Sequence, residues 1–308
     1  MKQNSLVLTG KRQLKWMTND LPALEEDEVL VRTIAGAISI GAELPQYIES
    51  DLTVNLPSYP KQTGYENYGE VVRIGEEVKT LKIGDRVVAS YGHRDLGIVK
   101  EQKAIPVPKD IHYSYALLTI LSCDAAKGVL KLNPRETDKV LVTGMGTMGL
   151  LTVYFLKQYM KVEHVDVLEP HAPRGSLAKI FGATDAFNRE SECPKDTYPF
   201  GFECSAYNGA FETLQRSVVK GGGICVLSDG NKERFQLSSA FYEKELKIIG
   251  SSDGWDYAKH AEWFFREVDH TPYVNKIFEL QITKDKLIEC FQSLSRGQVN
   301  PLKVLVTY

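Results

Sequence analysis

DKVLVTGMGTMG is the sequence of residues 138–149, and an apolar run to Met160 and a short segment, HVDVLE, at 164–169 follow it. The apolar residues 140–142 are typical of a strand that is buried on both faces of a sheet. The run to Met160 has the length of a helix, and the last segment reads as a second strand. A strand, a glycine-rich turn, a helix and a strand in this order predict the first βαβ unit of a dinucleotide-binding domain.

Each glycine of this turn has a physical task. Gly144 permits the tight turn, Gly146 lets the backbone approach a pyrophosphate, and Gly149 lets the helix lie close to the strand. The backbone N–H groups of Thr147 and Met148 at the helix start are expected to hold the phosphates.

Glu169 ends the second strand, about twenty residues beyond the last glycine, where a carboxylate can accept hydrogen bonds from a ribose diol. Its charge repels a 2′-phosphate, so the sequence favours NAD as the cofactor. Arg174 follows closely and could contact such a phosphate, which leaves NADP as the alternative.

The alternation of strands and helices continues after this unit. Six strands with crossover helices predict a doubly wound parallel sheet of the Rossmann type. Ligands of such sheets bind beyond the carboxyl ends of the strands, which places Cys204, Ser205 and Ser228 near the nicotinamide half of the cofactor. The further strands are expected at 184–188, 198–204, 223–227 and 246–250, and the helices at 173–181 and 208–219.

The rest of the chain is predicted to form a second domain. Residues 1–112 are rich in short β-branched segments separated by glycine and proline, which is typical of a small barrel, and a helix is expected at 114–132. The tail shows helices at 257–267 and 283–296 and strands at 277–280 and 303–306. We expect a catalytic domain of residues 1–122 and 256–308 and a cofactor domain of residues 123–255.

Composition narrows the function classes. The chain has 308 residues, a net charge of -3 and a pI near 6.1, so it lacks the basic excess of a nucleic-acid-binding protein. No uninterrupted apolar run reaches the length of a membrane span, and the first apolar run is too short for a signal peptide. The five cysteines are scattered, as expected for free thiols in a cytoplasmic protein.

Residues 64–78 read GYENYGEVVRIGEEV, and GDRV follows at 84–87. This pattern resembles the signature of the medium-chain dehydrogenase/reductase superfamily, in which Gly-His-Glu-x-x-Gly runs into Gly-Asp-x-Val. The resemblance implies a GroES-like β-barrel catalytic domain beside the Rossmann domain, an NAD(P)-dependent oxidoreductase activity, a small-molecule substrate and a homodimer.

This sequence differs from the family at the residues that bind its catalytic zinc. Zinc is held there by an early Cys, the His of Gly-His-Glu and a third Cys or acid, and the matching positions here are Ser39, Tyr65 and Thr119. These side chains are poor zinc ligands. We therefore expect no zinc, and we expect Thr119 to lie beside the cofactor instead.

A narrower similarity is to a zinc-lacking branch with a Ser-x-Gly-Thr-Glu segment, which includes bacteriochlorophyllide dehydrogenase-like and quinone oxidoreductase-like members. The matching segments here are SIGAE at 39–43, GYE at 64–66 and a histidine, His93, before the next barrel strand. Ala42 stands where the branch has threonine.

Without a metal, hydride transfer needs a proton or hydrogen-bond donor near the nicotinamide. Tyr65 is the first candidate and could equally be a barrel aromatic; His93 could relay a proton or be a surface loop residue. Ser39 could bind substrate or ribose. Glu43 and Glu66 complete the catalytic candidates, and burial of either carboxylate requires a partner such as an arginine or a lysine.

The sequence thus predicts transfer of hydride between a nicotinamide cofactor and a small alcohol or carbonyl compound without zinc. Two alternatives stay open. One is NADPH-dependent reduction of an enone or quinone C=C bond, and the other is a cofactor-binding regulatory protein with little catalysis.

Overall fold

A computed structural model describes residues 1–52, 58–230 and 233–308. The chain divides into two compact units. The first comprises the described parts of residues 1–50, 54–119 and 257–308, and the second those of 51–53 and 120–256.

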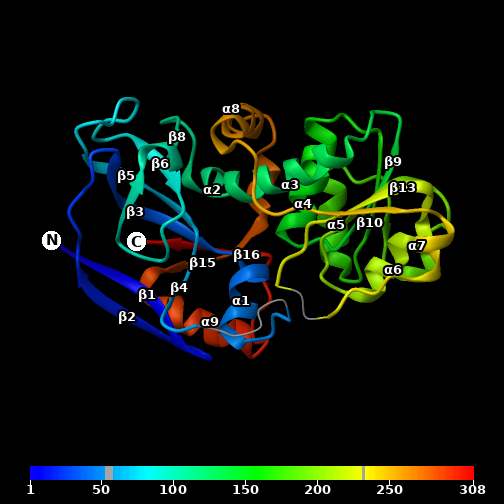
Figure 1. Cartoon of the computed structure of the whole chain (residues 1–308), viewed down its shortest axis with the longest axis horizontal. Coiled ribbons are helices and arrows are strands. Elements are labelled where there is room, and N and C mark those ends of the chain that lie inside the picture. The colour runs from blue at the N-terminus through cyan, green and yellow to red at the C-terminus, as the bar shows by residue number, and fades with distance from the viewer. Residues whose placement is uncertain (53–57, 231–232) are drawn as a thin grey trace. The chain divides into compact units, whose positions relative to one another are not determined.

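The second unit is built on a six-stranded sheet with the order β11-β10-β9-β12-β13-β14, and all its described strand pairs are parallel. This is the strand order of a Rossmann fold, in which strands are first added on one side of the first strand and then, from the fourth strand on, on its other side; here these strands are β9 and β12. Figure 1 shows the helices beside these strands, and α4 and α6 both pack on β9. In chain order the elements are α3 (Thr119–Leu132), β9 (Lys139–Thr143), α4 (Thr147–Gln158), β10 (His164–Leu168), α5 (Ala172–Ile180), β11 (Ala186–Phe187), η2 (Glu190–Glu192), β12 (Tyr198–Glu203), α6 (Asn208–Ser217), β13 (Val218–Val226), α7 (Ser239–Glu243) and β14 (Lys247–Gly250).

The apolar residues of this unit explain its layers. Strand β9 is buried from Val140 to Thr143, and α4 is buried continuously from Gly149 to Leu156. A helix that is apolar on all sides is stable only when other elements cover it. A core around Leu141, Phe211 and Ile224 completes the packing.

The first unit contains a seven-stranded sheet and a three-stranded sheet. The larger sheet follows the order β15-β16-β3-β5-β6-β8, with β7 also paired to β3, and the smaller sheet has the order β2-β1-β4. Before the Rossmann unit its elements are β1 (Lys2–Gly10), β2 (Gln13–Asp20), β3 (Glu28–Ile38), α1 (Ile40–Ile48), β4 (Lys61–Gln62), β5 (Glu66–Ile74), β6 (Arg86–Ala89), β7 (Leu96–Lys100), η1 (Glu101–Lys103), β8 (Ile105–Val107) and α2 (Tyr113–Ala116).

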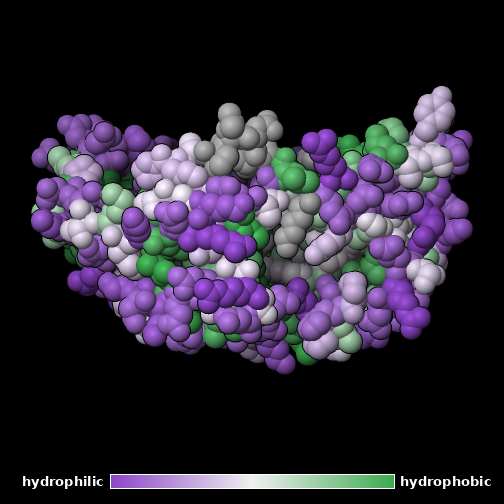
Figure 2. Space-filling view, turned by 90° about the horizontal axis from the view of Figure 1, so that it is seen from below, coloured by the Kyte–Doolittle hydropathy of each residue, from purple (hydrophilic) through white to green (hydrophobic). Residues whose placement is uncertain are grey.

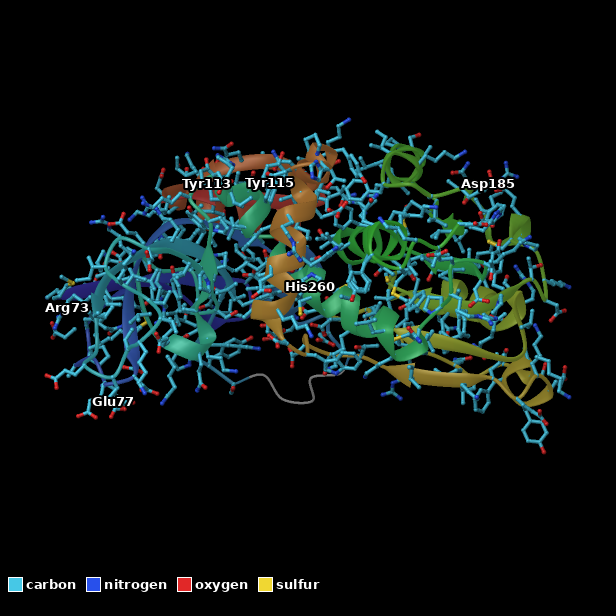
Figure 3. The ribbon with its side chains drawn as sticks, turned by 90° about the horizontal axis from the view of Figure 1, so that it is seen from above. Arg73, Glu77, Tyr113, Tyr115, Asp185 and His260 are labelled. Carbon is cyan, nitrogen blue, oxygen red and sulfur yellow. The ribbon has the colours of Figure 1, made fainter. Side chains whose placement is uncertain are left out.

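The C-terminal segment completes this unit, because β16 pairs antiparallel with β3 and parallel with β15. Both termini therefore lie in the first unit (Figure 1). Figure 3 labels Tyr115 on α2, whose hydroxyl lies 3.4 Å from the carbonyl oxygen of Pro272 in the same unit. The elements of the segment are α8 (Tyr257–Val268), η3 (Pro272–Ile277), β15 (Phe278–Thr283), η4 (Lys284–Lys286), α9 (Leu287–Ser295) and β16 (Lys303–Thr307).

Three predicted helices differ from the observed ones. The helix expected at 114–132 is split into α2 and α3, where the fully buried Leu117 and Leu118 show that packing overrides the helical pattern. The helix expected at 208–219 ends at Ser217, because β-branched Val218 begins a strand. The helix expected at 283–296 begins at Leu287, after a 3-10 turn.

No helix among the described residues is long and apolar enough to cross a membrane. Figure 2 shows a face that is mostly hydrophilic, with small separate apolar areas. Single exposed apolar side chains of this kind are ordinary on protein surfaces.

Candidate functional site

The glycine turn between β9 and α4 has the geometry that its sequence predicts. Gly144 adopts a φ of +80°, which side chains rarely tolerate, and a Cβ on Gly149 would lie 1.8 Å from the carbonyl oxygen of Gly144. By contrast, a Cβ on Gly146 would meet no atom within 4 Å. The turn therefore needs two glycines for its own packing, while the third leaves open space above the backbone.

The start of α4 offers the groups that bind an anion. Gly146 is the N-cap residue, no side chain caps the helix, and Thr147 and Met148 occupy the first turn, partly exposed. The backbone N–H groups of a first helical turn and the helix dipole favour negative charge at this point. These residues, together with the open space at Gly146, fit the pyrophosphate of a dinucleotide.

Glu169 lies against the same turn. One carboxylate oxygen accepts a hydrogen bond from the Met145 N–H at 2.7 Å, and the other accepts one from the His171 N–H at 2.8 Å. The residue is only 7% exposed, so these bonds hold its carboxylate in place. Arg174 lies near the start of α5 and is partly buried.

A second carboxylate, Glu203, forms hydrogen bonds with the serines that are expected near the nicotinamide. The sequence did not point to this residue. It ends β12, is fully buried, and accepts a hydrogen bond from the Ser205 N–H at 2.7 Å and another from the Ser205 hydroxyl. The Ser228 hydroxyl also bonds to it, and burial raises the pKa of Glu203. The half-buried Cys204 thiol lies 3.7 Å from the Thr152 hydroxyl.

The signal that could have identified Glu203 is its position. It is an acid at the carboxyl end of a central strand in a doubly wound sheet, beside the point where the strand order reverses. A buried carboxyl group there requires donors, and the serines that follow β12 and β13 supply them.

In the first unit, four of the predicted catalytic residues form one chain of hydrogen bonds. The Tyr65 hydroxyl donates to the Ser39 hydroxyl at 2.6 Å, and the Ser39 N–H donates to Glu43 at 2.8 Å. The other Glu43 oxygen lies 3.0 Å from Nε2 of His93. Residues that are 26 and 50 positions apart thus meet at the start of α1.

The structure places His93 in the interior, so the surface-loop interpretation is wrong. Its side chain is fully buried, its ring packs edge-on against Phe291 at 6.3 Å, and a Cβ on Gly64 would lie 2.7 Å from the ring. Among the described residues, Nδ1 of His93 has no hydrogen-bond partner. Burial on this scale suits a residue that positions Glu43 rather than one that touches a substrate.

Glu66 has the cationic partner that its burial requires. Lys303, on the C-terminal strand β16, lies 2.5 Å from its carboxylate, and both side chains are 0% exposed. Sequence spacing could not identify this lysine, because more than two hundred residues separate the partners. Thr119 is also fully buried, and its hydroxyl has no partner in the described part of the chain.

A catalytic zinc does not fit these residues. The positions that correspond to zinc ligands hold Ser39 and Tyr65, whose neutral hydroxyls already bond to each other, and Thr119. Zinc is bound in proteins by thiolate, imidazole or carboxylate groups. Within residues 1–52, 58–230 and 233–308, no group of three or more His, Cys, Asp or Glu side chains could hold a metal ion.

A second histidine, on α8, is partly buried. His260 lies on α8 (Figure 3), its ring is 5.2 Å from that of Trp263, and burial lowers its pKa to about 4. It is neutral at pH 7 and belongs to the packing of the first unit.

Comparison with known proteins agrees with this fold. Residues 25–109 match the family described as the alcohol dehydrogenase GroES-like domain. An L-threonine 3-dehydrogenase of Shewanella baltica is 25% identical over 320 residues, which cover 90% of this chain and 92% of the relative.

Solved structures show the same fold at lower identity. A short chain alcohol dehydrogenase of Escherichia coli CFT073 complexed with NADH has a TM-score of 0.86 at 19% identity and covers 100% of this chain and 99% of its own. A protein of Sinorhizobium meliloti 1021 bound to NADP has a TM-score of 0.85 at 17% identity, with 100% of both chains covered. The predicted fold class is therefore confirmed: a GroES-like domain with a Rossmann-like parallel sheet of six strands.

Proposed function

We propose, from the relation of this chain to the zinc-type alcohol dehydrogenase-like proteins of the medium-chain superfamily, that it is an NAD(P)-dependent oxidoreductase. It transfers hydride between the nicotinamide and a small alcohol or carbonyl compound, and it does so without a catalytic zinc. The observation that carries the proposal is the glycine turn, with Glu169 fixed against it at the reversal of the strand order.

The residues of the second unit have distinct roles toward the cofactor. The N–H groups at the start of α4 bind the pyrophosphate. Glu169, which keeps lone pairs beyond its two backbone bonds, accepts hydrogen bonds from the adenosine ribose and disfavours a 2′-phosphate. NAD is therefore the proposed cofactor, with NADP as the alternative. When bound, the nicotinamide supplies or accepts the hydride.

In the first unit, Tyr65 is the proposed proton donor. In the reducing direction its O–H gives the proton to the carbonyl oxygen while hydride reaches the carbonyl carbon, and solvent then returns a proton to the phenolate. Ser39, 2.6 Å away, can rotate its hydroxyl to donate to that phenolate. Glu43 and His93 keep Ser39 in place and act as positioning residues.

The proposed absence of zinc rests on the donor set. A catalytic zinc site takes its three protein ligands from thiolate, imidazole and carboxylate groups. The hydroxyls of Tyr65 and Ser39, which are hydrogen-bonded to each other, supply none of these groups. Tyr65 instead provides a hydrogen-bond donor at the position where the zinc-containing members of the medium-chain superfamily have a metal ligand.

The first experiment is a titration of metal-analysed protein with NADH and NADPH, followed by nicotinamide fluorescence. Saturable binding at zinc contents well below one per chain supports the proposal, and tighter NADH binding supports the role of Glu169. If neither cofactor binds, the proposal fails.

A substrate panel then separates the classes of reaction. Simple alcohols, diols, L-threonine and enones are tested with both cofactors. L-threonine is included because the relative from Shewanella baltica is an L-threonine 3-dehydrogenase. Turnover of enones alone would replace the proposal with C=C reduction. Cofactor binding without any turnover would indicate a regulatory protein.

A homodimer is part of the proposal. Strand β14 ends the described sheet and pairs there only with β13, so its outer edge can add a strand from a second copy. Light scattering that shows a monomer at micromolar concentration would contradict it.

A further inference from the structure

A cavity of about 200 Å³ lies within the first unit, next to the proposed proton donor. This is smaller than the ~300–1,000 Å³ of pockets that hold drug-sized ligands. It therefore suits a ligand of only a few carbon atoms. It is lined by residues of the three-stranded sheet, of α1 and α9, and of the segment between β4 and β5, which are Leu8, Leu14, Glu43, Gln46, Tyr47, Gln62, Thr63, Gly64, Tyr65 and Phe291.

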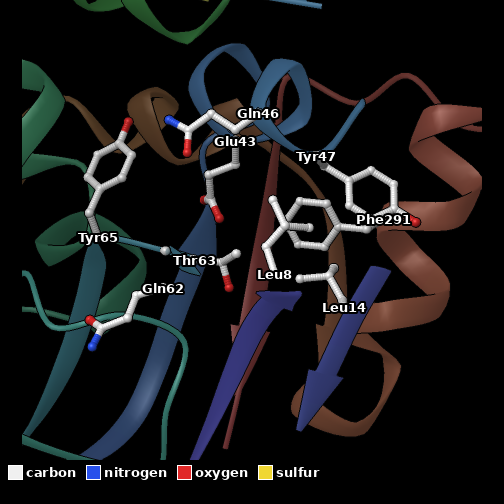
Figure 4. Close-up of a pocket in the computed structure, with 10 residues that line it drawn as sticks. Leu8, Leu14, Glu43, Gln46, Tyr47, Gln62, Thr63, Tyr65 and Phe291 are labelled. Atoms are coloured by element: carbon white, nitrogen blue, oxygen red, sulfur yellow. The ribbon is translucent and has the colours of Figure 1, made fainter. Parts of the chain in front are cut away.

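The two sides of the cavity differ in polarity. Figure 4 shows Gln46, Gln62 and Thr63 on the side of Tyr65, and it shows the leucines, Tyr47 and Phe291 on the opposite side. Two carboxamides provide both donors and acceptors, whereas the opposite wall provides a surface for a short hydrocarbon end. A molecule that fits both walls carries hydrogen-bonding groups on one end and a methyl or ethyl group on the other.

The charge of the lining is the decisive feature. It contains one carboxylate, Glu43, and neither lysine nor arginine. The partners of this carboxylate are the Ser39 N–H and the imidazole of His93, so the lining offers no lysine or arginine to pair with an anionic ligand. Since like charges brought together in a site of low dielectric constant repel strongly, a carboxylate or phosphate ligand is disfavoured here.

We propose that this cavity is the specificity pocket for the substrate and that it selects small uncharged diols. This inference rests on the proposed function, because it assigns the reacting hydroxyl to Tyr65. The second hydroxyl of the diol bonds to Gln46 or Gln62, and the short apolar end packs against Leu14 and Phe291.

The test compares two compounds with the same carbon skeleton, 1,2-propanediol and lactate, which differ in the group that follows the shared secondary hydroxyl. Saturation-transfer NMR on the cofactor-free protein measures their binding without any turnover. We expect a signal from propanediol and at least about a tenfold weaker one from lactate, as a like-charge contact implies.

A variant of the lining locates the effect. Gln46→Leu removes one hydrogen bond to the second hydroxyl, which should raise the KM for 1,2-propanediol by about five- to tenfold. The KM for 1-propanol should rise less, because this alcohol has no second hydroxyl to lose a hydrogen bond. Gln102→Leu is the matched control, since Gln102 is exposed in the same unit and does not line the cavity.

The outcomes separate the two proposals. Equal binding of lactate and propanediol, or an equal loss for both alcohols in Gln46→Leu, overturns the pocket even if NADH binds. Selective diol binding that Gln46→Leu weakens supports the pocket, even in a protein that fails to bind NADH and so overturns the proposed function.

Discussion

The glycine turn of the second unit and the hydroxyl chain of the first unit are both candidate functional structures, but they are built differently. The turn consists of neighbouring residues and one acid on the next strand, with Met145 and Glu169 only 24 positions apart. The chain of Tyr65, Ser39, Glu43 and His93 joins three segments and depends on how β5, α1 and the loop before β7 pack. Local spacing therefore encodes the first structure, whereas the whole unit creates the second.

The largest expected effect tests the hydroxyl chain. Tyr65→Phe removes the proposed proton donor and should lower turnover by about 10²- to 10⁴-fold, the range typical of a general acid. Steady-state kinetics on the best substrate of the panel measures it, while NADH affinity stays the same.

Tyr68→Phe is the control for this change. Tyr68 is buried on β5, which begins just after Tyr65, and its ring lies 6.1 Å from that of Tyr113. Full activity in both variants would remove Tyr65 from the mechanism and leave the hydroxyl chain as a structural feature.

The next effect concerns the pair that anchors the C-terminal strand. Lys303→Met removes the ammonium group that lies 2.5 Å from the fully buried Glu66 carboxylate, and removal of one member of a buried pair costs about 3–5 kcal/mol in free energy of unfolding. Urea unfolding followed by far-UV circular dichroism measures the change.

The double variant Glu66→Gln/Lys303→Met sharpens the result. It removes both charges, so its free energy of unfolding should lie closer to that of the wild type than the Lys303→Met value does. If the single variant lost less than about 1 kcal/mol, the size of an exposed pair, this long-range contact would not hold the first unit together.

A smaller effect distinguishes two glycines of the turn, since substitution of one should lower stability and substitution of the other should lower NADH affinity. Gly149→Ala places a Cβ 1.8 Å from the Gly144 carbonyl oxygen and should destabilise the protein by about 1–3 kcal/mol, as overpacking does. Gly146→Ala meets no atom within 4 Å, so its melting temperature should stay the same while its NADH affinity falls about tenfold or more. Calorimetry and the NADH titration measure the two properties. A normal NADH affinity in Gly146→Ala would mean that the cofactor does not approach this turn.

These contrasts show what the sequence could predict. The order of strands, the glycine turn and Glu169 follow from residues whose spacing matches a local structure, so the fold was predictable. Lys303 could not be identified, because its partner is distant in sequence and an isolated lysine near the end of a chain has no periodic signal. His93 was expected either at a catalytic position or on the surface, and only the packing of Gly64 and Phe291 shows that it is buried. Glu203 could have been found by asking which acids end central strands.

The smallest expected effect concerns Glu101, a carboxylate with a purely structural role, which contrasts with Glu169, the carboxylate proposed to bind the cofactor. Glu101 resembles Glu169, since one of its oxygens accepts hydrogen bonds from the N–H groups of Lys79, Thr80 and Leu81, at 2.9, 2.5 and 3.1 Å. The bond from the Thr80 N–H, then the Thr80 hydroxyl and the other two N–H groups, lower the pKa of Glu101 from 4.5 to about 2. No predicted ligand lies there, so Glu101→Gln should change stability and leave NADH affinity unaltered.

The sign of the pH dependence follows from the lowered pKa. A carboxyl group whose pKa is lower in the folded protein stabilises it fully above its unfolded value of 4.5, and this contribution disappears as the pH falls toward about 2. The melting temperature of Glu101→Gln should therefore lie at most about 2 °C below that of the wild type at pH 7, as expected for an exposed group. The two curves should converge in acid. A difference that grew below pH 4.5 would contradict this role of Glu101. It would also remove the example of a carboxylate that stabilises the fold through backbone N–H groups and binds no ligand.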